Sequence, residues 1–170
     1  MVMLGLVMWL VLLLPNALSA QSGEDAARSA KVDSLYAAYK TAGFPEVPDL
    51  SVGDFLKMAG GDSLVLVDVR EPAEQAVSML PGAITMAAFE AEAASYSDYR
   101  IVVYCTIGFR SALYTRQLRE KGLDAYNLAG SLLAWAHAGQ VLVDSLGPTR
   151  TAHVYGETWD LLPEGYRSVW

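Results

Sequence analysis

Hydrophobic residues in the middle of the chain form two short, uninterrupted runs. One run covers residues 64–67 (LVLV) and leads into Asp68, and the other covers residues 101–104 (IVVY) and leads into Cys105. Runs without polar interruptions are typical of parallel strands whose two faces are both buried. The pattern therefore predicts that Asp68 and Cys105 lie at the carboxyl ends of two buried strands.

The segments around these runs have the spacing and the end signals of helices and short strands. Ser51 and Asp54 form an N-terminal cap pattern for a short helix that ends at Gly60 and Gly61. Further short strands are predicted at residues 83–85 and 124–128, and helices at residues 86–95, 111–121 and 131–137. Strands that alternate with helices predict an α/β fold with a mostly parallel central sheet and helices on both faces.

An apolar stripe at helical spacing precedes this region. Its members are Val32, Leu35, Tyr36 and Tyr39, at the i, i+3, i+4 and i+7 positions of one face. Residues 21–25 (QSGED) are predicted to be a solvated lead-in, and Gly43 and the prolines after it end the helix. We expect the stripe to pack on the domain.

The first residues of the chain have the composition of a targeting segment. Residues 1–14 carry no charged or polar side chain, and Pro15 and a stretch of small residues up to Ala20 follow them. This predicts a signal peptide over residues 1–20 and export to the periplasm or secretion. The apolar run is shorter than the roughly 20 residues that span a bilayer. The alternative is a membrane anchor, with residues 1–14 as the tether.

Charge and cysteine content exclude several classes of function. The net charge is −7 and there is no run of Lys or Arg, so a nucleic-acid partner is not expected. A single cysteine cannot form an intramolecular disulfide, and His137 and His153 have no further ligand at zinc-binding spacing. We expect neither a metal nor a cofactor.

The loop that begins at Cys105 has the features of a site for a nucleophilic thiol. It comprises Cys105, Thr106, Ile107, Gly108, Phe109, Arg110 and Ser111. Backbone amides in so short a loop, the start of the next helix and the guanidinium of Arg110 would all favour the thiolate. Gly108 permits a positive φ, and Ser111 is predicted to cap the helix. An inert core cysteine is the alternative, and the position of Cys105 argues against it.

Four motifs in the chain, taken in order, resemble the rhodanese (sulfurtransferase) family. They are residues 68–74 (DVREPAE), 80–84 (LPGAI), 105–111 (CTIGFRS) and 128–135 (LAGSLLAW). The resemblance covers about residues 50–139 and implies the three-layer rhodanese-like fold. It also implies that Cys105 accepts sulfane sulfur from a donor, holds it as a persulfide and passes it to a nucleophilic acceptor.

Roles for other residues come from the same resemblance. Asp68 and Arg70 would belong to a network that steadies the active-site region, and Arg110 would help to bind anionic donor groups. The implied partners are a small-molecule sulfur donor and a thiol or cyanide-like acceptor, with a partner protein as a further candidate. No cofactor is implied.

The chain departs from the family pattern at two places. Family members often have Gly-His where this chain has Ser78 and Met79. In the loop, Arg110 is the only cation, which favours a less charged persulfide over thiosulfate as the donor. Four residues separate Cys105 from Arg110. Related phosphatases and arsenate reductases typically have a longer loop, so sulfur transfer is favoured over these activities.

The predicted organisation has four parts. They are a signal peptide or anchor (1–20), a helix and linker (21–48), a rhodanese-like domain (49–139) and an aromatic C-terminal extension packed on the domain (140–170). The predicted protein is an exported single-domain sulfurtransferase. A non-catalytic rhodanese-fold module that binds a partner or senses oxidation remains the alternative from another class. Whether the extension covers the cysteine loop is left open.

Overall fold

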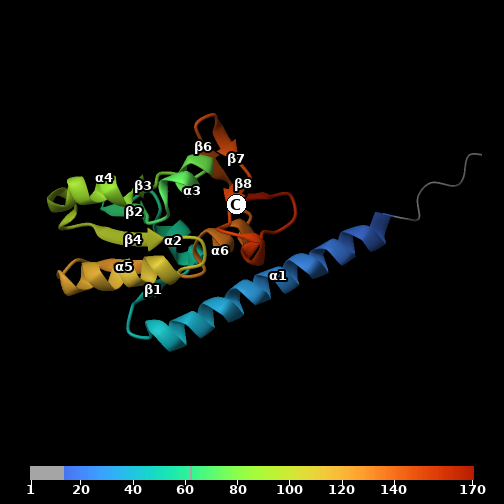
Figure 1. Ribbon diagram of the computed structural model, residues 1–170, viewed down its shortest axis with the longest axis horizontal. Coiled ribbons are helices and arrows are strands. Elements are labelled where there is room, and N and C mark those ends of the chain that lie inside the picture. Colours follow the sequence, from blue (N-terminus) through green and yellow to red (C-terminus); the bar gives the residue numbers. More distant parts are fainter. Residues whose placement is uncertain (1–13, 62) are drawn as a thin grey trace, which may run out of the picture.

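The computed structural model describes residues 14–61 and 63–170, with side chains from residue 22 onward, and its centre is a parallel sheet (Figure 1). The five strands lie in the order β1-β5-β4-β2-β3. They are β1 (Asp49–Leu50), β2 (Leu64–Asp68), β3 (Ile84–Thr85), β4 (Arg100–Tyr104) and β5 (Ala125–Leu128). The helices are α1 (Leu14–Gly43), α2 (Val52–Met58), α3 (Pro72–Val77), α4 (Met86–Ala91), α5 (Phe109–Glu120) and α6 (Ser131–His137).

Helices cover both faces of the sheet. Side chains alternate between the two faces along each strand, so each strand contributes to two hydrophobic cores. Leu66 and Val102 belong to a core shared with α2 and α6, whereas Val67 and Val103 belong to a core shared with α4 and α5. This arrangement confirms the predicted α/β fold with helices on both faces. Cys105 follows directly on the central strand β4.

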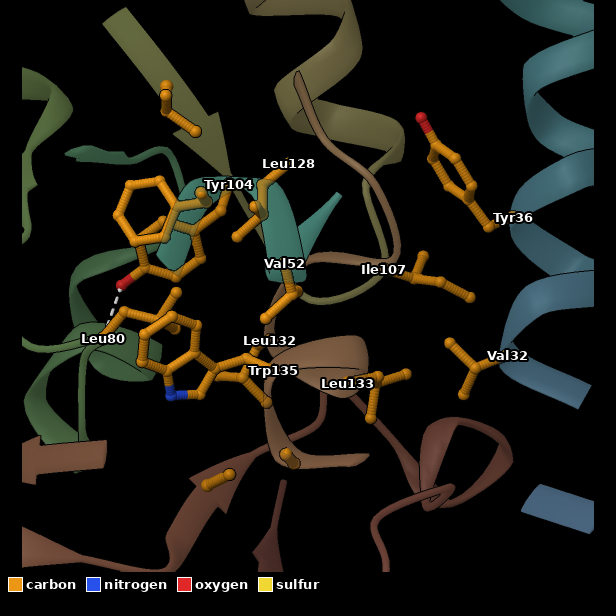
Figure 2. Close-up of a cluster of buried hydrophobic side chains, with 14 of the residues drawn as sticks. Val32, Tyr36, Val52, Leu80, Tyr104, Ile107, Leu128, Leu132, Leu133 and Trp135 are labelled. Atoms are coloured by element: carbon orange, nitrogen blue, oxygen red, sulfur yellow. Dashed lines mark hydrogen bonds between the residues drawn. The ribbon is translucent and has the colours of Figure 1, made fainter. Parts of the chain in front are cut away.

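Helix α1 packs along the first of these cores and extends well beyond the body of the molecule (Figure 1). Figure 2 shows Val32 and Tyr36 of α1 facing Ile107 of the cysteine loop and Leu133 of α6. The apolar stripe therefore packs on the domain as predicted.

The predicted lead-in at residues 21–25 was wrong, because these residues lie inside α1. Arg28 pairs with Glu24 at 3.4 Å and with Asp25 at 3.0 Å, one helical turn before it, and such pairs stabilise a helix. Asp25 also accepts a hydrogen bond from the backbone N–H of Glu164 at 2.9 Å. A charged segment was thus read as solvated coil although its charges pair along a helix.

The signal-peptide prediction falls mostly on residues 1–13, which lie outside the described residues. Residues 14–20 form the beginning of α1. Among the helices in the described part of the chain, none combines the length and apolar character that a membrane crossing requires. The prediction for residues 1–20 stays a prediction.

Several element ends differ from the prediction for local reasons. The helix predicted at residues 86–95 ends at Ala91, and a short 3₁₀ turn, η1 (Ala93–Tyr96), follows it. The helix predicted from residue 111 begins at Phe109, because Gly108 precedes it in a left-handed conformation. Helix α3 was not predicted, although Pro72 at its start and the Glu71–Glu74 capping box are recognisable signals.

Residues 140–170 form two small sheets on the domain. The strands β6 (Leu142–Asp144) and β7 (Gly147–Thr149) pair antiparallel, β8 (Thr151–His153) and β9 (Arg167–Val169) pair parallel, and η2 (Glu157–Trp159) lies between β8 and β9. Met79 exchanges two backbone hydrogen bonds with Val143, at 2.8 and 2.9 Å. Ser78 Oγ donates to the carbonyl of Thr151 at 2.6 Å. The extension is thus attached where Ser78 and Met79 depart from the family pattern.

Candidate active site around Cys105

The thiol of Cys105 lies at the start of the loop between β4 and α5 and is 2% exposed. The backbone N–H of Gly108 donates to Cys105 Sγ at 3.2 Å, and Ser111 Oγ lies 3.5 Å from the same sulfur. The thiol is free. The loop therefore curls around one sulfur atom and presents hydrogen-bond donors to it, as the sequence predicted.

Gly108 is required at its position for two reasons. Its φ is 106°, a left-handed conformation that other residues rarely adopt. A Cβ atom added there would lie 2.6 Å from Cε2 of Tyr36. Helix α1 therefore approaches the loop so closely that only glycine fits.

The amino-terminal end of α6 holds the outer side of the loop. The backbone N–H groups of Leu132 and Leu133 donate to the carbonyls of Cys105 and Thr106, at 3.2 and 3.1 Å. Ser131 Oγ accepts a hydrogen bond from the N–H of Cys105 at 3.2 Å. Free N–H groups at a helix start bind acceptors in this way. These three hydrogen bonds hold the backbone of Cys105 and Thr106 in place.

Ser111 does not cap α5, contrary to the prediction, because it is the third residue of that helix. Its hydroxyl is buried and donates to Asn127 Oδ1 at 2.7 Å. Asn127 Nδ2 in turn donates to the carbonyl of Gly108 at 3.2 Å and to the hydroxyl of Tyr36 at 2.8 Å. Ser111 thus connects the thiol to a polar network below the loop.

This network extends to Asp49 in the edge strand β1 of the central sheet. The hydroxyl of Tyr36 donates to Asp49 Oδ1 at 2.6 Å, and burial together with this bond raises the pKa of Tyr36. Sequence reasoning missed Asn127 and Asp49 as supporting residues and read Tyr36 as packing alone. A polar residue inside the short apolar strand β5 was the available signal for Asn127.

Arg110, the only cation of the loop and the residue expected to help bind anionic donor groups, is paired within the protein. Its guanidinium makes two hydrogen bonds to the carboxylate of Glu74, at 2.6 and 2.8 Å, and a third to Thr106 Oγ1 at 3.2 Å. Although burial opposes it, the hydrogen bond from Arg110 lowers the pKa of Glu74. The side chain of Glu74 is 3% exposed, so the pair is shielded from water on the carboxylate side. The positive charge of Arg110 is therefore balanced within the protein.

Asp68 and Arg70 form a buried network that does not contact the thiol. Arg70 Nη2 lies 2.6 Å from Asp68 Oδ2 and donates to the carbonyl of Ser78, also at 2.6 Å. The hydroxyl of Tyr104 donates to Asp68 and accepts from the N–H of Leu80 at 3.0 Å (Figure 2). The network joins the ends of β2 and β4 to residues 78–80, to which the extension is bonded. That it steadies the active-site region stays a prediction.

A cavity of about 370 Å³ opens above the thiol. Its lining residues come from α1, from the loop and from the extension: Tyr39, Cys105, Thr106, Ile107, Phe109, Arg110, Tyr155 and Trp159. The extension therefore contributes to the surroundings of the thiol, a point that the sequence left open. Within residues 14–61 and 63–170, no group of three or more His, Cys, Asp or Glu side chains is placed to hold a metal ion.

Comparisons with known proteins agree with this architecture. The chain is 32% identical over 91 residues to a sulfurtransferase of Allochromatium vinosum, covering 51% of this chain and 85% of the relative. It is 42% identical over 72 residues to a tRNA sulfurtransferase of Desulfurococcus amylolyticus, covering 42% of this chain but only 14% of that protein. A thiosulfate sulfurtransferase structure from Pseudomonas aeruginosa superposes with a TM-score of 0.53 at 22% identity, over 71% of this chain and 23% of that one.

At that level of identity the solved structure supports the fold alone. The family model described as the rhodanese-like domain matches residues 51–138, which is more than half of the chain. The matched segment contains β2, β4, the cysteine loop and α6, and it leaves α1 and the extension outside. The chain therefore belongs to the rhodanese-like domain family.

Proposed function

We propose that this protein is a sulfurtransferase in which Cys105 carries sulfane sulfur as a persulfide. The observation that carries the proposal is a free thiol at the floor of a cavity, in a loop that directs the Gly108 N–H toward its sulfur at 3.2 Å. Family membership and the names of two relatives support the same reaction class.

Each half of the proposed reaction exchanges one bond to sulfur. The Cys105 thiolate attacks the outer sulfur of the donor, a Cys105 S–S bond forms, and the donor group leaves with the electron pair of the broken bond. A thiolate or cyanide then attacks the same outer sulfur, and Cys105 leaves as the thiolate. The backbone N–H of Gly108 stabilises the charge that returns to Sγ in this second step.

The environment of Arg110 favours sulfur transfer over phosphate or arsenate chemistry. A tetrahedral oxyanion in the loop would need an unpaired positive charge, but the guanidinium of Arg110 is already paired with the carboxylate of Glu74 through both Nη atoms. The carbonyls of Cys105 and Thr106 are held by α6, so the loop has little freedom to widen. A sensor role is also disfavoured, because a thiol that is 2% exposed reacts poorly with bulky partners.

Intact-mass analysis tests the proposal directly, because Cys105 is the only cysteine. After incubation with a sulfane-sulfur donor, the protein is expected to gain one sulfur atom and to lose it on addition of cyanide. The Cys105→Ser variant is the matched control and should gain none. If the wild type gains no sulfur from any donor, the carrier role is incorrect and the binding or sensing module becomes the better reading.

Export through residues 1–20 is part of the same proposal. The apolar composition of residues 1–14 and the small residues before position 21 support it. Sequencing the amino terminus of the protein recovered from a bacterial periplasm is the test. A new terminus near residue 21 is expected, and an intact terminus in the membrane fraction would favour the tether instead.

A further inference from the structure

We propose that the cavity above Cys105 selects a sulfur donor whose leaving thiol carries an apolar hydrocarbon group, and that α1 and the extension set this preference. The inference rests on the proposed sulfur transfer and adds the class of substrate. Two observations support it: the lining of the cavity is aromatic, and Arg110, the one charged side chain among the described lining residues, is paired with Glu74.

Four of the lining side chains are aromatic, and the ring of one of them, Tyr39, lies close to two of the others. The four are Tyr39, Phe109, Tyr155 and Trp159. The rings of Tyr39 and Phe109 meet edge to face with centroids 5.4 Å apart, and those of Tyr39 and Trp159 lie 6.2 Å apart. Rings at such distances form a continuous apolar wall. A hydrocarbon group that enters the cavity therefore loses water contact against aromatic surface.

Charge in the cavity argues against an anionic donor. Among the described residues that line it, Arg110 is the only charged one. Glu74 neutralises this guanidinium from below, and the ring of Tyr155 covers it with its centroid 5.3 Å from the guanidinium carbon. A dianion such as thiosulfate would lose its hydration without gaining a free counter-charge. The chain's net charge of −7 adds to this penalty.

Tyr155 is held in place by the fold. Its φ is 71°, in the left-handed region that costs a non-glycine residue free energy. Its backbone N–H donates to Nδ1 of His153 at 3.1 Å, and its side chain is among the exposed large hydrophobic groups. An exposed ring kept above the site in a strained conformation fits a role in contacting substrate.

Three of the four aromatic side chains that line the cavity come from outside the segment that matches the family. Tyr39 lies on α1, and Tyr155 and Trp159 lie on the extension, whereas the match covers residues 51–138. The domain thus contributes the reactive thiol and Phe109, and the added elements contribute the other aromatic side chains of the lining. A volume of about 370 Å³ is near the lower end of ligand pockets, which span roughly 300–1,000 Å³, so one small hydrocarbon group fits.

The proposed step balances without any further reactant. The Cys105 thiolate attacks the outer sulfur of R–S–SH, the S–S bond of the donor breaks, and R–S⁻ leaves with the electron pair of that bond. The outer sulfur keeps its proton and becomes the outer atom of the Cys105 persulfide. Cys105 sulfur is oxidised as the donor thiol is reduced, as in thiol–disulfide exchange.

The experiment compares two persulfides with different groups on the leaving sulfur, benzyl persulfide and 2-sulfonatoethyl persulfide. The rate of sulfur uptake by Cys105 is followed by rapid quenching and intact mass. We expect the wild type to react at least about tenfold faster with the benzyl donor, the scale on which an apolar pocket discriminates.

Variants of the wall identify its contribution. Trp159→Ala and Tyr155→Asn should each reduce the benzyl rate severalfold and leave the sulfonatoethyl rate nearly unchanged. Asn tolerates a left-handed backbone, so Tyr155→Asn removes the ring with little risk to folding. Trp170→Ala is the matched control, because Trp170 is an exposed aromatic of the same extension that does not line the cavity. It should leave both rates unchanged.

A binding measurement separates the two proposals. Calorimetry with benzyl methyl sulfide and the Cys105→Ser variant reports the apolar site without any transfer. Equal wild-type rates for both donors, with wall variants that alter both alike, would overturn the selectivity and leave the carrier role intact. A different result would overturn the carrier role and leave the apolar site intact. In that case Cys105 takes up sulfur from neither donor, but benzyl methyl sulfide still binds and Trp159→Ala weakens its binding.

Discussion

At the scale of single residues, the site depends on groups that touch the loop from a distance in sequence. Gly108 is packed under Tyr36, and Arg110 is bonded to Glu74. Neither contact alters the thiol itself, but both decide the shape and charge around it. Substitutions at Gly108 and Glu74 therefore test the site without removing Cys105.

Replacing Gly108 with alanine should destabilise the protein and slow sulfur uptake. The new Cβ would meet the Tyr36 ring at 2.6 Å in a backbone with φ 106°, and we expect a loss of about 2–4 kcal/mol. Gly122→Ala is the control, since its φ is 83° but nothing lies within 4 Å. It should cost only about 1 kcal/mol in denaturant unfolding. Equal losses would mean that α1 does not confine the loop.

Replacing Glu74 with glutamine should change both donor preference and the pH dependence of stability. Freed from its carboxylate, Arg110 could attract anions, so thiosulfate turnover should rise severalfold relative to the wild type. The pKa of Glu74 is lowered in the fold from an ordinary value of 4.5. Its stabilising contribution is therefore complete above pH 4.5 and is lost as the pH falls through the lower folded value.

Unfolding curves at a series of pH values between 7 and 3 measure this contribution. The wild type should lose stability below pH 4.5 more steeply than Glu74→Gln does. Glu71→Gln is a suitable control, because Glu71 is exposed and adjacent in the same capping box. Parallel curves for wild type and Glu74→Gln would contradict the assigned pairing.

At the scale of elements, α1 and the C-terminal extension are built into the domain's core. Val32 and Tyr36 of α1 share one hydrophobic cluster with Leu142 and Val154 of the extension. The extension is further bonded to Ser78 and Met79, where the chain departs from the family pattern. We therefore expect these elements to fold together with the sheet as one cooperative unit.

Leu142→Ala tests this cooperativity. Leu142 is 0% exposed, so its truncation should cost about 2–4 kcal/mol, whereas Val141→Ala at a 39% exposed neighbour should cost well under 1 kcal/mol. The whole protein should unfold in one transition by both circular dichroism and tryptophan fluorescence. An early fluorescence transition confined to the variant would mean that the extension unfolds independently.

At the scale of the whole molecule, we expect surface charge to affect how fast a charged donor reacts. A net charge of −7 repels dianions at a distance, and salt screens this repulsion. The second-order rate with thiosulfate should therefore rise severalfold between 20 mM and 500 mM salt, by an order-of-magnitude argument from screening. The rate with benzyl persulfide, whose leaving group carries no fixed charge, should change much less. Stopped-flow measurements that show a falling thiosulfate rate would contradict the repulsion.

The sequence alone determined the parts of this protein that depend on neighbouring residues. Uninterrupted apolar runs predicted β2 and β4, and the position of Cys105 after the second run predicted its loop and the helix that follows. These features are local, because a few consecutive residues determine whether a strand is buried, where a glycine is needed and where a helix ends. The α/β fold follows from their order.

Only the tertiary structure decided what surrounds the thiol. The partner of Arg110 lies 36 residues away, and the contact of Asn127 with Tyr36 joins residues 91 positions apart. The aromatic cavity combines α1 with an extension that begins after the matched domain ends. Periodicity fixes which face of an element is apolar, but packing decides which elements meet. The position of the thiol could therefore be predicted from the sequence. The pairing of Arg110 with Glu74 and the aromatic lining of the cavity could not.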